Sequence, residues 1–125
     1  MRDLPSGAAL LALGRDLLLD ELLPLLPPER HRELRLVATA MAIAEREAIA
    51  GDAPMHDILR QLAGFYGDSE PSDSLLRRLA ADLRAGAFDA CAMRGRAARA
   101  ILWRMTMMKL REGNPHFLAA NGFGE

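Results

Sequence analysis

The sequence predicts an all-α protein, folded as a compact up-and-down bundle of about five helices with a short C-terminal tail. Its 22 Ala and 22 Leu far outnumber the 1 Val, 4 Ile and 2 Thr, so helix-forming residues dominate over the β-branched residues that strands prefer. Half of the residues are hydrophobic, which is too apolar for a disordered chain. A length of 125 residues is typical of one domain, so we expect a single helical domain over residues 1–125.

Apolar periodicity, interrupted by proline and glycine, predicts where the helices begin and end. The first helix starts at Ser6, a good capping residue, and is stopped by the prolines that begin at Pro24. The second starts near Pro28 and ends at Gly51, and Gly86 ends the fourth. The predicted helices are 6–23, 28–50, 54–66, 74–85 and 89–112, followed by a tail over 113–125. Their short connections favour antiparallel neighbours.

The last predicted helix has two opposite apolar faces. At about 100° per residue, Ile101 and Met108 fall on one face, whereas Trp103 and Met107 fall on the other. Such a helix is either central in the bundle or buries its second face against another copy of the chain. A bundle of this size has little room for an enclosed helix, which favours a homodimer. The predicted interface residues are Ile101, Trp103, Met107, Met108 and, in the tail, Phe117.

Two carboxylates fall on apolar seams of the predicted helices. Glu45 lies within the apolar stripe of the second helix, and Glu21 lies on the leucine-bearing side of the first. Glu21 is in line with Gly14, whose missing side chain would let a neighbouring backbone approach closely. A buried carboxylate needs a partner, and Arg104 and Arg111 lie between the apolar faces of the last helix.

These four residues support two interpretations. In the first, Glu21, Glu45, Arg104 and Arg111 form internal ion pairs that set the register of the helices. In the second, they line a pocket between helices, where an arginine holds a ligand carboxylate or phosphate and a glutamate acts as an acid or base. A cavity with these charged groups turned inward would favour the second interpretation.

No familiar catalytic, metal or nucleotide motif occurs in the sequence. Glu-x-x-His, His-x-x-x-His, Cys-x-x-Cys, Gly-x-Gly-x-x-Gly and Walker-type patterns are all missing, and the three histidines are dispersed. We therefore expect no metal, no cofactor and no catalytic residues. The single Cys91 excludes a disulfide framework within the chain and favours a reducing compartment. With neither a signal peptide nor a membrane span, a cytoplasmic protein is expected.

Charge is distributed unevenly along the chain. Residues 1–70 hold 7 basic and 12 acidic groups, and residues 71–125 hold 9 and 5. The basic half could bind nucleic acid or a phosphorylated ligand, or acidic early helices could simply pack beside basic later ones. A net charge of −1 argues against a nucleic-acid partner, because nucleic-acid-binding domains are normally positive overall.

Three segments resemble a bacterial family of small helical proteins of unknown function. They are Leu17–Pro24, Leu36–Glu47 and Lys109–Leu118, and the resemblance spans about Leu10 to Leu118. Members of that family are often encoded beside phosphotransferases that resemble aminoglycoside kinases and beside acyl-CoA dehydrogenases. The resemblance therefore implies an accessory role in acyl-CoA or related catabolism, with a metabolic enzyme as partner. It brings no catalytic residues to transfer.

The sequence thus predicts a non-catalytic binding or accessory protein that forms homo-oligomers. The alternative is a bundle that binds a small molecule, an acyl-CoA or a phosphorylated metabolite, in a pocket lined by the four glutamate and arginine residues.

Overall fold

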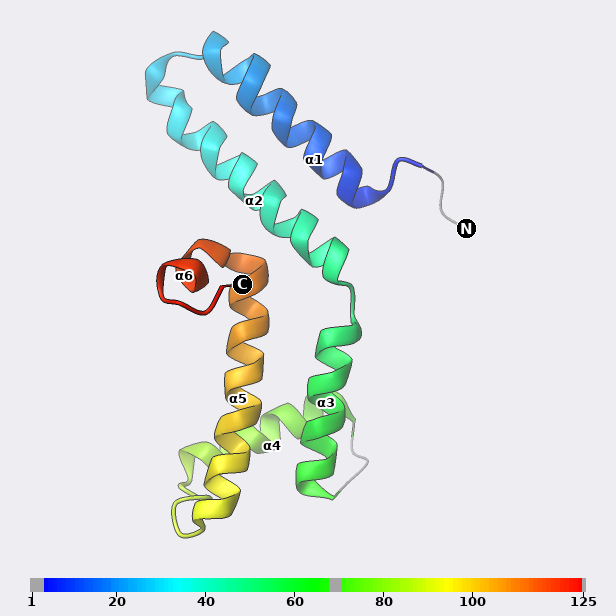
Figure 1. Cartoon of the computed structure of the whole chain (residues 1–125), viewed down its shortest axis with the longest axis vertical. Helices are drawn as coiled ribbons and strands as arrows, with labels where there is room; N and C mark the ends of the chain where they lie inside the picture. The colour runs from blue at the N-terminus through cyan, green and yellow to red at the C-terminus, as the bar shows by residue number, and fades with distance from the viewer. Residues whose placement is uncertain (1–3, 68–70, 125) are drawn as a thin grey trace. The chain divides into compact units, whose positions relative to one another are not determined.

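The computed structural model describes residues 4–67 and 71–124, and the regular structure within them is entirely helical. The predicted all-α class is confirmed. By its internal contacts the chain divides into two compact units, which meet in sequence between Gly51 and Asp52. Figure 1 shows the helices of each unit.

The first unit is a hairpin of two helices, α1 (Gly7–Leu17) and α2 (His31–Ala50), which lie side by side in Figure 1. Ser6 caps α1, since its side chain accepts a hydrogen bond from the Ala9 N–H at 3.2 Å. At the other end of the unit, Gly51 follows α2 with a φ of 64°, a conformation that glycine adopts without strain. Both of these sequence-predicted boundaries are confirmed.

The first predicted helix, which extends to about residue 23, is helical over that length but not α-helical throughout. The chain passes from α1 into a π-helical turn (Leu18–Leu22) and then into a 3₁₀ turn (Leu23–Leu25). Pro24 gives the physical reason, because it has no N–H and its ring would clash with the carbonyl four residues earlier in an α-helix. A second 3₁₀ turn (Pro28–Arg30) leads into α2, so the α-helix proper begins three residues after the predicted start.

The second unit contains α3 (Ala53–Tyr66), α4 (Ser72–Arg84), α5 (Ala92–Gly113) and α6 (Pro115–Ala120). Both α4 and α5 contact α3, and in Figure 1 α4 crosses the direction of α3 and α5 rather than running along them. Buried side chains from these helices and the α4–α5 connection form one core: Ile58, Leu62, Leu75, Leu79, Phe88, Ala98 and Ile101.

Two sequence-predicted boundaries in this unit need correction. The last long helix begins at Ala92 rather than Asp89, because hydrogen bonds from Asp89 N–H to Gly86 O (3.1 Å) and from Cys91 N–H to Phe88 O (3.4 Å) hold the preceding residues in turns. The helix α4 covers Ser72–Arg84 instead of 74–85, and Gly86 follows it with a φ of 69°.

The segment predicted as a tail contains the additional helix α6. Asn114 caps it by accepting the Phe117 N–H at 3.2 Å, and Pro115 occupies its first turn. After α6 the chain turns back through Gly122, which has a φ of 76°, and the Phe123 N–H bonds to Leu118 O at 2.8 Å. This six-to-one bond is typical of a Schellman motif, so the C-terminal segment is folded against its own helix.

The two apolar faces of α5 have different neighbours within the second unit. Ala98 and Ile101 lie in the core, with Met105 and Met108 packed against it. On the other face Met107 is buried, and the rings of Trp103 and Phe123 pack edge to face with their centroids 5.4 Å apart. The folded C-terminal segment therefore covers part of the α5 face that carries Trp103. The sequence alone allowed this face to lie either inside the bundle or at a dimer interface.

Candidate functional site

The two predicted glutamates occupy different settings in the first unit. Glu45, on α2, is partly buried, with 20% of its side chain exposed, and its carboxylate is ion-paired with the Arg15 guanidinium from α1. Glu21 lies in the π-helical turn and is exposed. Glu45 thus has its ion-pair partner within the same hairpin.

Arg15 is the ion-pair partner of Glu45, which the sequence pattern did not identify. A signal was present, because Arg15 follows Gly14 and Glu45 lies one helical turn after Met41. In the structure, a Cβ on Gly14 would lie 2.7 Å from the Met41 methyl carbon, so these helices touch there and Arg15 reaches Glu45. Identifying the pair required the register of α1 on α2, which neither helix pattern specifies.

The two predicted arginines lie on α5 and are both exposed. Arg104 donates a hydrogen bond to the Gln61 side-chain oxygen on α3. Arg111, in the last turn of α5, lines a groove beside α6. Arg104 and Arg111 therefore lie in different surroundings within the second unit.

The predicted interface residues are split between the interior and the surface of the second unit. Ile101 and Met107 are buried, and Met108 is partly buried against the core. Trp103 and Phe117 stay about half exposed, at 53% and 48%. The accessible part of this predicted surface is thus reduced to two aromatic side chains.

A cluster of aromatic and charged side chains joins the C-terminal end of α3 to its neighbours. The Tyr66 hydroxyl donates to the Asp82 carboxylate on α4 at 2.6 Å, and burial, this hydrogen bond and the Asp82 charge raise the pKa of Tyr66 to about 12. The Arg78 guanidinium stacks on the Tyr66 ring at 4.2 Å, and Arg94 stacks on the Phe65 ring at 4.4 Å. A phenol held neutral in this way contributes to helix packing.

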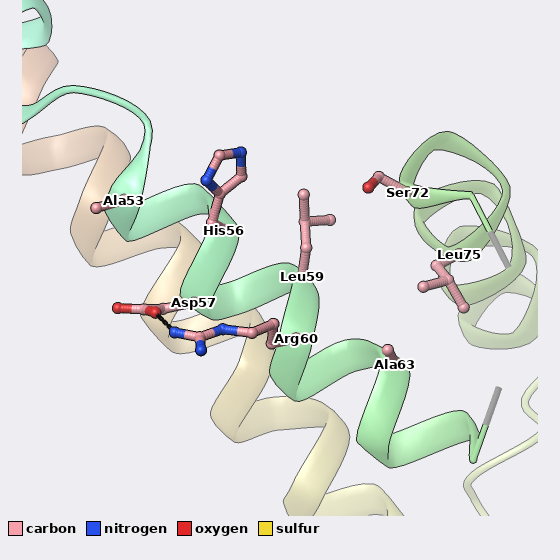
Figure 2. Close-up of a pocket in the computed structure, with 8 residues that line it drawn as sticks. All are labelled: Ala53, His56, Asp57, Leu59, Arg60, Ala63, Ser72 and Leu75. Atoms are coloured by element: carbon pink, nitrogen blue, oxygen red, sulfur yellow. Dashed lines mark hydrogen bonds and ion pairs between the residues drawn. The ribbon is translucent and has the colours of Figure 1, made fainter. Parts of the chain in front are cut away.

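Described residues of the second unit line at least two grooves. The first, of about 570 Å³, runs between α3 and α4. Figure 2 shows His56 and Leu59 of α3 on one side, Ser72 and Leu75 of α4 on the other, and an ion pair that joins Asp57 to Arg60. Among the described residues that line this groove, Arg60 is the one arginine, and Asp57 neutralises it, so the groove offers little net charge to an ionic ligand.

The second groove, of about 670 Å³, lies where α5 ends and α6 begins. Two nitrogen-bearing side chains, Arg111 and His116, share it with an apolar wall. Its lining residues are Arg111, Pro115, His116, Leu118, Ala119, Phe123 and Gly124. Among the described residues that line it none is acidic, and Arg111 supplies a positive charge.

Other chemistry has limited support in the part of the chain that the structure describes. Across residues 4–67 and 71–124, no three His, Cys, Asp or Glu side chains come together as a metal site. The His31 imidazole is hydrogen-bonded to Leu26 O at 2.9 Å, and Cys91 is exposed just before α5. None of the described helices combines the length and apolar character needed to cross a membrane.

The described helices and surfaces define a small all-helical protein that has open grooves and a hairpin with exposed leucines. The chain belongs to the family described as Domain of unknown function (DUF6285), whose match covers residues 24–117. A search of curated proteins and of solved structures found no match. The expected membership of a family of unknown function is confirmed, and the match begins after α1.

Proposed function

We propose that this protein is a non-catalytic binding or accessory protein that self-associates through the outer face of α1. One observation carries the proposal: Leu10, Leu13 and Leu17 are 56%, 62% and 50% exposed. Their spacing puts them on one side of α1. Among the described residues of this hairpin, only Leu34 and Ala38 are buried. A two-helix unit with so small a core gains stability when its apolar side is covered.

A second copy of the chain is the partner that this face fits best. If two α1 helices run antiparallel so that Leu10 of one faces Leu17 of the other, the leucines of both copies meet. In this arrangement Asp20 and Glu21 of each copy approach the first turn of α1 in the other. That turn contains no acidic residue, and its free N–H groups favour nearby negative charge. The face is therefore complementary to itself in shape and in charge.

The expected association is weak. Full burial of a leucine contributes about 1.5–3 kcal/mol, so six half-exposed leucines contribute on the order of 5–9 kcal/mol before the cost of association. Association itself costs about 4 kcal/mol or more, so at most about 5 kcal/mol remains, and the dissociation constant should lie at about 0.2–1 mM.

Sedimentation or light scattering over a concentration series tests the proposal. The mass should rise from 13.7 kDa toward twice that value as the concentration increases from about 5 to about 500 μM. Leu13→Glu should keep the chain monomeric, because like charges then meet near the two-fold axis. An equal mixture of Leu13→Glu and Leu13→Lys should associate again, because opposite charges then meet. This recovery requires both variants to be folded, so it separates loss of the interface from loss of folding.

Leu36→Glu provides a matched control, because Leu36 is 60% exposed on α2, outside the proposed face. It should associate as the unchanged chain does. A monomer at about 500 μM would overturn self-association. Loss of association in Phe117→Asp but not in Leu13→Glu would instead place the interface at the predicted surface of α5 and the C-terminal segment.

The accessory role and its enzyme partner rest on the family resemblance. An acyl-CoA dehydrogenase or a phosphotransferase encoded beside this protein is the proposed partner. Co-expression with each neighbouring gene product, followed by purification through a tag on this chain, tests the idea. Recovery of none of these enzymes in a stoichiometric complex would contradict it. The second candidate function, small-molecule binding, is favoured by the groove that contains Arg111.

A further inference from the structure

We infer that the groove between the end of α5 and α6 binds an organic carboxylate with a short aliphatic body, held by Arg111 and His116. The cationic head of Arg111 comes from the last turn of α5, and His116 comes from the first turn of α6. The Asn114–Pro115 break between the helices brings both side chains to the same groove.

The polar end of the groove matches a carboxylate. A guanidinium donates two parallel hydrogen bonds to a carboxylate, and an imidazole N–H supplies one more. Among the described residues that line the groove none is acidic, in contrast to the α3–α4 groove, where Asp57 pairs with Arg60. Arg111 can therefore form its ion pair with the ligand without first losing an acidic partner that lines the groove.

The remaining wall is apolar and well defined. Leu118 is buried beneath it, and Phe123 remains 48% exposed while its ring edge contacts Trp103. The turn at Gly122 and the hydrogen bond from Phe123 N–H to Leu118 O hold this wall in place. Gly124 closes it, since a Cβ there would lie 2.9 Å from the Ala119 Cα. The wall thus suits a short hydrocarbon body better than a hydrated polar group.

Size and composition together limit the ligand. A volume of about 670 Å³ falls within the range of ordinary small-molecule sites and has room for a short-chain carboxylate. The Arg111 guanidinium carries one positive charge, which one carboxylate balances, whereas a phosphate monoester carries about 1.5 to 2 negative charges at neutral pH. A monocarboxylate with a short alkyl chain satisfies both ends of the groove.

Trp103 provides a direct measurement, because it is the only tryptophan in the chain and contacts Phe123. Titration of the full chain with hexanoate should give a saturable change in Trp103 fluorescence. Hexanol has the same body without the charge, and inorganic phosphate has charge without the body. Each should bind at least tenfold more weakly than hexanoate. A lack of saturable change with hexanoate, or equal binding of hexanol, would overturn the proposal.

Variants then assign the binding to the groove. Arg111→Gln should weaken hexanoate binding by about tenfold or more, and His116→Ala should weaken it by a smaller factor. Arg104→Gln is the matched control, since Arg104 is also exposed on α5 but does not line the groove. If Arg104→Gln weakens binding as much as Arg111→Gln, the assignment is wrong. Leu13→Glu should leave hexanoate binding unchanged, so failure of self-association and failure of this site can be told apart.

Discussion

At Gly14, a missing side chain determines how closely two helices approach. The Met41 methyl group fills the space that a Cβ would occupy, at 2.7 Å from its position. The sequence predicted close approach of a backbone at this position, but the structure shows a flexible side chain there instead. Because the far end of a methionine moves easily, the site can adapt to a small substituent.

Gly14→Ala should therefore change the free energy of unfolding by less than about 1 kcal/mol. The gain in helix propensity, about 1 kcal/mol, is offset by displacement of Met41. Gly64→Ala on α3 is the control, because nothing lies within 4 Å of its Cβ position, and it should gain the full amount. Urea unfolding of both variants measures this. A loss above about 2 kcal/mol in Gly14→Ala would show that Met41 cannot move.

The free energy of unfolding should depend on pH through Tyr66. Its pKa is raised to about 12, mainly by burial and then by Asp82, so folding favours the neutral phenol. The resulting stabilisation is complete below pH 10.0, the ordinary pKa of tyrosine, and is lost as the pH rises toward 12. Because Tyr66 is the only tyrosine, the ultraviolet absorbance of its phenolate reports this titration directly.

Replacing Asp82 by Asn removes the negative charge beside the hydroxyl while keeping an oxygen that can accept its hydrogen bond. The pKa of Tyr66 should then fall toward 10.0. An unchanged titration would show that Asp82 does not contribute to the shift. Asp89→Asn, in the turn before α5, should leave the titration as it is.

At the scale of elements, α6 shows how local chemistry stabilises a very short helix. It has six residues, too few for stability on its own, but it starts at the Asn114 cap and Pro115 and ends in the turn at Gly122. Asparagine is favoured at the N-cap of a helix, proline in its first turn and glycine just after its C-terminal end. The helix also covers part of the second face of α5.

Asn114→Ala should release α6, because it removes the side chain that accepts the Phe117 N–H. We expect a loss of about 1 kcal/mol in unfolding free energy and faster amide exchange at Phe117 and Leu118. Asn114→Ser, which keeps an accepting oxygen, should restore protection. Unchanged exchange in the alanine variant would mean that packing alone holds the helix.

At the scale of the molecule, the two units have very different interiors. The described part of the first unit buries Leu34 and Ala38, whereas the second has a continuous core drawn from α3, α4, α5 and the α4–α5 connection. Local stability follows the density of buried apolar contacts, so the units should open with different free energies. The small core of the first unit also supports the proposal that a second copy of the chain covers α1.

Hydrogen exchange should show this difference. Amides of Leu62 and Ile101, in the core of the second unit, should exchange far more slowly than that of Leu13 in α1. Protection at Leu13 should increase with protein concentration, because association covers it. Equal protection in both units, independent of concentration, would contradict this account of α1.

The sequence by itself determined the helical class, the helix boundaries at Ser6 and Gly51, the Gly86 turn and membership of a family of unknown function. These depend on local propensity and on motifs within one segment of the chain. It did not predict the π-helical turn before Pro24 or the helix α6. Only the tertiary structure showed that Glu45 pairs with Arg15 and that Arg111 shares a groove with His116. Such partners depend on the rotation and register of one helix against another, and an amphipathic pattern leaves both free.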